Sequence, residues 1–121
     1  MTPLLLNAAR AFAMVAFADG VLAPAEAQRF SRLAAKDPAF SHHGHAEIAD
    51  AWNAAAHEVH AAQSFGGALL AIRTEITRAA DKAVIMRLAQ AATVADGKLE
   101  AQENKAVSEL AAALGLDAEK F

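Results

Sequence analysis

The sequence predicts an all-α fold in which six or seven helices form a single bundle with short connecting loops. Alanine, the strongest helix former, accounts for 35 of the 121 residues. Apolar residues recur at three- and four-residue spacing along most of the chain, and no segment alternates with period two for long enough to form a strand. Because this length suits one hydrophobic core, we expect a single domain over residues 1–121.

The first two helices are predicted from their end signals. The first begins at Thr2-Pro3, with Thr as the N-cap and Pro as the first helical residue, and it ends near Asp19-Gly20. Pro24 then occupies a position typical of a first helical residue, and Glu26 falls at the third helical position. The second helix is expected to stop before Asp37-Pro38.

A loop rich in His and Gly, residues 41–44, leads into the third predicted helix. The residues expected on its buried face recur at helical spacing: Ile48, Trp52, Ala55, Val59 and Ala62. Trp52 is expected to anchor the core, because large aromatic side chains dominate burial on an alanine-rich stripe. Gly66-Gly67 interrupts the pattern and is interpreted as a loop between helices.

Three more helices are predicted from apolar stripes over residues 69–76, 84–95 and 107–114. The second of these is expected to end at Asp96-Gly97 and the third at Gly115, a typical helix C-terminal glycine. Residues 117–121 are expected to form a final short turn.

The composition excludes several classes of function. Lys and Arg total 11 against 14 Asp and Glu, and the formal net charge of −3 gives no general attraction to nucleic acid. Cysteine is absent, which rules out disulfides, zinc–thiolate sites, iron–sulfur clusters and cysteine nucleophiles. The most apolar stretch, 4–18, is cut by Asn7 and Arg10 and falls short of the roughly 20 apolar residues that a membrane span needs. A cytoplasmic protein is expected.

No signature of an enzyme is present in the sequence. It contains no Gly-x-Ser-x-Gly nucleophile elbow, no His-Glu-x-x-His zinc motif and no phosphate-binding glycine loop. Four arginines, Arg10, Arg73, Arg78 and Arg87, are scattered over separate segments and are expected on a solvated face rather than in an anion-binding groove. We therefore expect a non-catalytic protein without an organic cofactor.

One motif occurs twice, at a constant offset of 77 residues. Ala-Asp-Gly-Val-Leu at 18–22, followed by Glu26, returns as Ala-Asp-Gly-Lys-Leu at 95–99, followed by Glu103. Apolar residues downstream of each glutamate match at the same offset. The recurrence predicts two pseudo-symmetric halves, each with a helix, an Asp-Gly turn and a second helix opened by an acidic residue.

The aspartates of this motif, Asp19 and Asp96, have two interpretations. Each lies in the last turn of a predicted helix, where a negative charge opposes the helix dipole at a cost of about 0.3–1 kcal/mol. Either each carboxylate accepts hydrogen bonds from nearby amides and the motif only joins helices, or the two aspartates converge with Glu26 and Glu103 on a divalent cation as oxygen ligands.

The duplicated Ala-Asp-Gly-x-Leu-x-x-x-Glu motif, with Ala-Ala-Ala-Leu-Gly-Leu at 111–116, resembles the TerB-like family over essentially the whole chain. That family includes tellurite-resistance proteins and a domain attached to some membrane-anchored J-domain co-chaperones. The resemblance implies an internally duplicated bundle of about seven helices, and a role in stress responses with partner proteins at the membrane. It also implies that Asp19, Glu26, Asp96 and Glu103 form a metal-binding or interaction surface.

Five histidines fall in two groups, one in a loop and one on a helix: His42, His43 and His45, and then His57 and His60. With Trp52 facing the core, His57 points away from it and His60 lies toward the flank, so both are expected in solvent. A zinc, nickel or copper site is the alternative, provided that the loop meets the helix.

We interpret the chain as a non-catalytic, stress-associated interaction module that binds a divalent cation through the duplicated motif. Its expected partner is a protein at the inner face of the membrane. Two alternatives stay open. One is a small metal-dependent enzyme built on the His-rich region, and the other is a purely structural helical interaction domain whose acidic motifs only cap and join helices.

Overall fold

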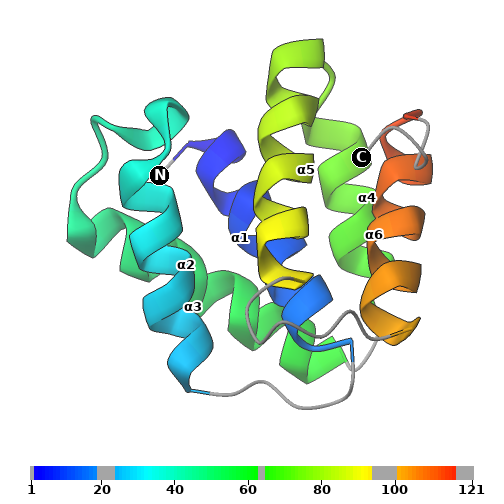
Figure 1. The fold of residues 1–121 in the computed structure, drawn as a ribbon, viewed down its shortest axis with the longest axis horizontal. Helices are drawn as coiled ribbons and strands as arrows, with labels where there is room; N and C mark the ends of the chain where they lie inside the picture. Colours follow the sequence, from blue (N-terminus) through cyan, green and yellow to red (C-terminus); the bar gives the residue numbers. More distant parts are fainter. Residues whose placement is uncertain (1, 19–23, 63–64, 94–100, 117–121) are drawn as a thin grey trace.

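The computed structural model describes residues 2–18, 24–62, 65–93 and 101–116, and all regular structure within these ranges is helical. The helices follow one another as α1 (Pro3–Ala16), α2 (Ala25–Lys36), the 3-10 turn η1 (Pro38–Phe40), α3 (His45–Ala62), α4 (Gly66–Glu75), α5 (Ala79–Thr93) and α6 (Ala101–Ala113). They pack together as a bundle (Figure 1). The prediction of an all-α fold is confirmed.

Helix α1 lies at the centre of the bundle and contacts each of the other five α-helices described. Every residue from Leu5 to Val15 is buried except Leu6 and Arg10. A helix that is apolar around most of its circumference is typical of a bundle interior, whereas a surface helix carries one apolar stripe. Four fully buried alanines contribute only small side chains, which lets the surrounding helices approach closely: Ala8, Ala9, Ala11 and Ala13.

Three aromatic side chains join α1 to α2 and α3. Phe12 meets Phe30 edge-on with 5.5 Å between ring centroids and Trp52 edge-on with 5.8 Å, while Phe30 and Trp52 stack at 5.5 Å. Both phenylalanines are fully buried, and Trp52 is 5% exposed. The prediction that Trp52 anchors the core is confirmed.

Two helix ends follow the predicted signals. The hydroxyl of Thr2 accepts a hydrogen bond from the backbone N–H of Leu5 at 3.3 Å and so caps α1. Near the C-terminal end of the described chain, Gly115 has a φ of 73°, a conformation that favours glycine. The backbone N–H groups of Gly115 and Leu116 donate to carbonyls in the last turn of α6 at 3.1 and 2.8 Å, which satisfies the end of that helix.

Three sequence predictions about helix ends are wrong. Helix α1 ends at Ala16 rather than near Asp19-Gly20. Gly66-Gly67 opens α4 instead of forming a loop, because the apolar residues that follow pack on α1 and α6, and tertiary packing outweighs the low helix propensity of glycine. Ala62 is exposed, since it lies in the last turn of α3 beyond Val59, the last buried residue of that helix.

The two halves predicted from the repeated motif have matching helices. An offset of 77 residues carries the end of α1 at Ala16 onto the end of α5 at Thr93, and the end of α2 at Lys36 onto the end of α6 at Ala113. Helices α1 and α5 pack against each other, and α2 and α6 each contact both of them. The internal duplication is therefore visible in the helix boundaries as well as in the sequence.

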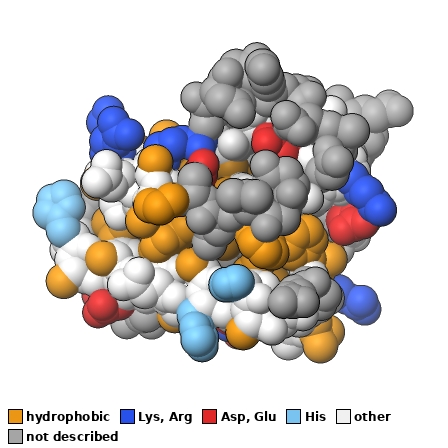
Figure 2. Space-filling view, turned by 90° about the horizontal axis from the view of Figure 1, so that it is seen from below, with side chains coloured by type: hydrophobic (Ala, Val, Ile, Leu, Met, Phe, Trp, Pro, Cys, Tyr) orange, Lys and Arg blue, Asp and Glu red, His pale blue; other side chains and the backbone are white. Residues whose placement is uncertain are grey.

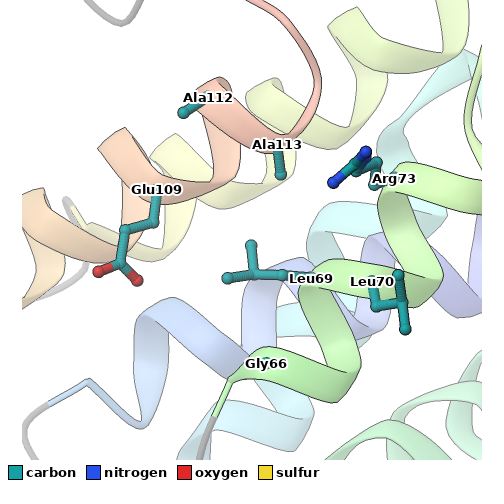
Figure 3. Close-up of a pocket in the computed structure, with 7 residues that line it drawn as sticks. All are labelled: Gly66, Leu69, Leu70, Arg73, Glu109, Ala112 and Ala113. Carbon is teal, nitrogen blue, oxygen red and sulfur yellow. The ribbon is translucent and has the colours of Figure 1, made fainter.

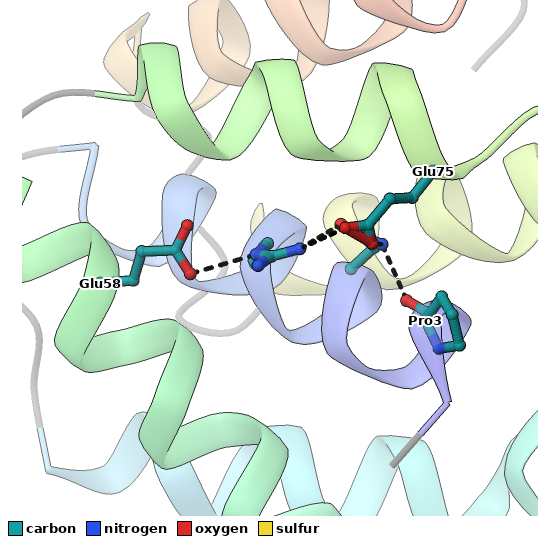
Figure 4. A network of polar contacts seen from close by, with 5 residues as sticks. Pro3, Glu58 and Glu75 are labelled. Atoms are coloured by element: carbon teal, nitrogen blue, oxygen red, sulfur yellow. Dashed lines mark hydrogen bonds and ion pairs between the residues drawn. The ribbon is translucent and has the colours of Figure 1, made fainter.

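A polar network links α1 to α3 and α4 (Figure 4). Fully buried Asn7 accepts a hydrogen bond from Nη1 of Arg10 at 2.9 Å, and its Nδ2 donates to Oε2 of Glu75 at 3.0 Å. Arg10 also donates from Nε to Glu58 at 3.2 Å, and its Nη1 lies 3.6 Å from Oε1 of Glu75. The Arg10 side chain is only 12% exposed, so the prediction that it lies on a solvated face is wrong. Helices α3 and α4 each place one glutamate beside it.

Candidate functional site

The structure describes half of the predicted acidic site. Glu26 lies in the first turn of α2 and Glu103 in the first turn of α6, and both are half-buried. Asp19 and Asp96 lie outside the described residues. Helices α1 and α5 end, and α2 and α6 begin, at one end of the bundle (Figure 1). We call these two last turns and two first turns the motif end.

Arg29 connects the two halves at the motif end. Its Nη1 donates to both carboxylate oxygens of Glu26, at 2.7 and 2.6 Å. Its Nη2 lies 3.4 Å from the backbone carbonyl oxygens of Ala91 and Ala92, in the last turn of α5. Such carbonyls lack partners within their helix and carry partial negative charge, so a guanidinium there is stabilising. The guanidinium carbon also lies 5.5 Å from the centroid of the Phe12 ring, a favourable position for a cation.

Sequence reasoning missed Arg29. The available signal was its position three residues after Glu26, since residues at that spacing are neighbours on a helix. Its contacts with α5, 62 and 63 residues further along the chain, have no local signal. Because Arg29 compensates the charge of Glu26, a cation bound at this carboxylate would share it with a guanidinium.

The described part of the motif end does not by itself make a metal site. Within the four described ranges, no three His, Asp or Glu side chains converge as ligands for a metal ion. Oxygen-preferring cations such as Ca²⁺ take about 6–8 ligands, so Asp19 and Asp96 would be needed to complete a shell begun by Glu26 and Glu103. The cation site therefore stays a prediction. Seen from the motif end, the described residues present hydrophobic, acidic and basic side chains on this face (Figure 2).

The histidines do not gather into one site. His43 contacts Glu47 in the first turn of α3, and its ring lies 5.7 Å from that of His42. His57 and His60 are both exposed, as predicted. His57 follows His45 by twelve positions along α3, which at the helical rise places these two residues about 18 Å apart. Seen from the motif end, histidine side chains lie at the left edge of the view and, well apart from it, near the lower centre (Figure 2).

An ion pair between a buried carboxylate and a half-exposed arginine joins the end of α2 to α5. Arg87 donates from Nε to Oδ2 of Asp37 at 2.9 Å and from Nη2 to Oδ1 at 2.8 Å. The Asp37 side chain is 7% exposed and that of Arg87 is 53% exposed. Burial alone raises the pKa of the Asp37 carboxyl, but the hydrogen bonds from Arg87 and from the backbone N–H of Ala39, with the charge of Arg87, outweigh burial and hold this pKa below its usual value.

The lowered pKa of Asp37 predicts a pH-dependent contribution to stability. Since the unfolded pKa is about 3.9, the pair stabilises the fold above about pH 4 and ceases to do so as the pH falls through the lower folded pKa. We expect Arg87→Met to reduce the free energy of unfolding near neutral pH by about 1–2 kcal/mol, a figure discounted because Arg87 is half in water. Urea unfolding at a series of pH values should show this difference shrink in acid.

The matched control for Arg87→Met is Arg32→Met, which removes an exposed arginine from α2. This change should alter the stability little at any pH. A difference between the Arg87→Met variant and the parent protein that is as large at pH 3 as at neutral pH would contradict the assignment.

The fold and the motif end define a class of protein: an internally duplicated helical bundle with an acidic helix start in each half. A family model described as Tellurite resistance protein TerB matches residues 5–121, and the chain belongs to this family. The resemblance noted from the duplicated motif is thereby confirmed. Comparison with curated proteins and with solved structures gives no match. No helix within the described ranges is long and apolar enough to cross a bilayer.

Proposed function

We propose that this chain is a non-catalytic interaction module of the tellurite-resistance type, and that its motif end binds a divalent cation. The observation that carries the proposal is the position of the two motif helices. Glu26 and Glu103, separated by 77 residues, open α2 and α6 at the same end of the bundle. The four ligands proposed are Asp19, Glu26, Asp96 and Glu103, each through carboxylate oxygens.

The contacts of Arg29 give the proposed cation a structural effect. Arg29 joins Glu26 to the last turn of α5 and rests on Phe12. A cation that draws on the Glu26 carboxylate changes the charge that Arg29 faces, and with it the contact between α2 and α5. Cation binding would therefore stabilise or reorient the surface at the motif end to which a protein partner binds. We propose that this partner acts at the inner face of the membrane and that the chain itself is cytoplasmic.

The enzymatic alternative lacks support in the described residues. A transition-metal centre on the His-rich region requires the loop histidines and His57 or His60 in one coordination shell. The length of α3 between His45 and His57 places these two residues about 18 Å apart. The purely structural alternative is favoured by one observation, the pairing of Glu26 with Arg29, and the experiment below distinguishes it from the cation site.

The test is a thermal melt of chelator-treated protein with and without Ca²⁺, Mg²⁺, Mn²⁺ and Zn²⁺. A ligand that binds only the folded state stabilises it by about 2.7 kcal/mol at a concentration 100 times its dissociation constant. We expect a rise in melting temperature with an oxygen-preferring ion, and we expect Asp19→Ala/Asp96→Ala to abolish it. The control, Asp50→Ala/Asp81→Ala, changes the net charge equally, at helix positions away from the motif end, and should keep the response.

The outcomes separate the alternatives. No shift with any ion, together with lower stability of Asp19→Ala/Asp96→Ala, would make the motif a helix joint and overturn the cation site. A shift with Zn²⁺ alone that survives this double substitution but disappears in His43→Ala would move the metal to the loop histidines and also overturn it.

A further inference from the structure

A shallow apolar groove of about 550 Å³ runs between α4 and α6 (Figure 3). Its lining includes Leu69 and Leu70 of α4 and Ala112 and Ala113 of α6. Leu70 is 63% exposed and is the only large hydrophobic side chain exposed among the residues that the structure describes. Leu70 extends the apolar lining of this groove onto the surface, and the resulting continuous apolar patch is suited to contact with another molecule.

Opposite charges stand at the two ends of this groove. Figure 3 shows Arg73 of α4 toward one end and Glu109 of α6 toward the other, with Leu69 between them. No ion pair joins either residue to another part of the chain that the structure describes. The remaining lining residues are small, so the hollow beside Leu70 has room for an incoming aliphatic side chain.

This arrangement is complementary to itself. A twofold axis through the middle of the groove places Arg73 of one copy opposite Glu109 of the other, and the reciprocal pair follows by symmetry. The same rotation brings the protruding Leu70 of each copy over the groove of its partner. A foreign helix would need its own acidic and basic residues at matching spacing, whereas a second copy already supplies both charges and the apolar side chain.

We propose that the α4–α6 groove is a self-association surface on which two copies of this chain pair about a twofold axis. Leu70 is the apolar contact of each copy, and two reciprocal Arg73–Glu109 ion pairs set the orientation. The described lining residues come from α4 and α6 and include neither Glu26 nor Glu103, so this association does not require a cation at those carboxylates. Self-association at this groove and cation binding at the motif end can therefore be tested independently, and either can be wrong without the other.

The test is sedimentation equilibrium of the full chain from low to high micromolar concentration. We expect a monomer–dimer equilibrium that Leu70→Asp weakens at least about tenfold, because it places charge in the apolar contact. Leu70 is exposed, so this variant should keep the parent melting temperature at low protein concentration. The control for the added charge is Asn53→Asp at an exposed position of α3, which should dimerise as the parent does.

Charge reversal tests whether two symmetry-related Arg73–Glu109 ion pairs form between the copies. Arg73→Glu and Glu109→Arg should each weaken self-association at least about tenfold, since each places like charges opposite one another twice. An equimolar mixture of these two variants should associate again, because each chain then meets its opposite at both contacts, and Arg73→Glu/Glu109→Arg in one chain should associate as the parent does. Arg78→Glu, at an exposed position just after α4, is the control for single reversal.

The proposal would be overturned by a monomer at every concentration, or by a dimer whose stability is unchanged by Leu70→Asp and by both charge reversals. Weakening by the single reversals without recovery in the mixture would also overturn it. A monomeric chain that binds an unrelated helix in this groove would overturn it equally.

Discussion

Replacing Phe12 by alanine should lower the free energy of unfolding by about 3–5 kcal/mol. Phe12 is fully buried in the central helix, and its ring meets Phe30 and Trp52. The guanidinium of Arg29 lies over the same ring. The truncation therefore leaves a cavity where three helices meet and also removes the surface on which Arg29 rests. Urea unfolding followed by circular dichroism measures the loss.

Domains of this size are stable by only about 5–15 kcal/mol, so a milder change at the same position is needed as well. Phe12→Leu keeps an apolar side chain there and should cost about 1.5 kcal/mol or less. The matched control is Phe17→Ala, at the half-buried C-cap of α1, for which we expect less than half the loss of Phe12→Ala. Equal losses at Phe12 and Phe17 would show that the aromatic cluster does not organise the core.

Replacing Arg10 by methionine should cost about 2–3 kcal/mol. Methionine retains the apolar part of the side chain but removes the hydrogen bonds to Glu58 and to buried Asn7. The carbonyl oxygen of Asn7 then loses its partner inside the bundle. Because Glu58 and Glu75 are each 40% exposed, water solvates them in the variant and keeps the loss below that of a fully buried pair.

A double-mutant cycle apportions the Arg10 effect. The variants are Glu58→Gln and Glu75→Gln, each alone and each combined with Arg10→Met. Both glutamates should show a coupling free energy with Arg10. An exposed glutamine or glutamate elsewhere should show none. Arg78→Met, an exposed arginine outside the helices, serves as the control and should change stability within about 0.5 kcal/mol. A loss of that small size for Arg10→Met would contradict the structural role assigned to the network.

Features that depend on neighbours along the chain were predictable. The cap at Thr2, the terminal glycine at position 115 and the burial of Trp52 all follow from local pattern, and the structure has all three. Helical periodicity shows which face of a helix is buried, and it placed His57 and His60 correctly in solvent. The repeated motif showed the duplication because its two copies keep one offset.

Features that depend on which helix lies opposite were not predictable. The partners of Arg10, Arg29 and Arg87 lie on or at the end of other helices far along the chain, at separations of up to 65 residues, that of Arg10 and Glu75. The neighbouring sequence predicts only that a long, positively charged side chain projects from a helix at each of these positions, and it does not identify the partner. The candidate cation site was proposed from the repeated motif and the family resemblance. The structure adds that the helices opened by Glu26 and Glu103 begin at the same end of the bundle, and that Arg29 binds Glu26.

Each half of the bundle packs against the first helix of the other half, and this arrangement affects how the chain folds. Helix α2 reaches α5 and α6 reaches α1, so the second helix of each half completes the surroundings of the other half's first helix. Neither half buries its own apolar surface alone. Two separate half-length chains would pair only at a sufficiently high protein concentration. In one polypeptide the linker holds the two halves together, which gives each half a high effective concentration of the other. Splitting the chain between α3 and α4 should therefore give fragments that fold only when mixed.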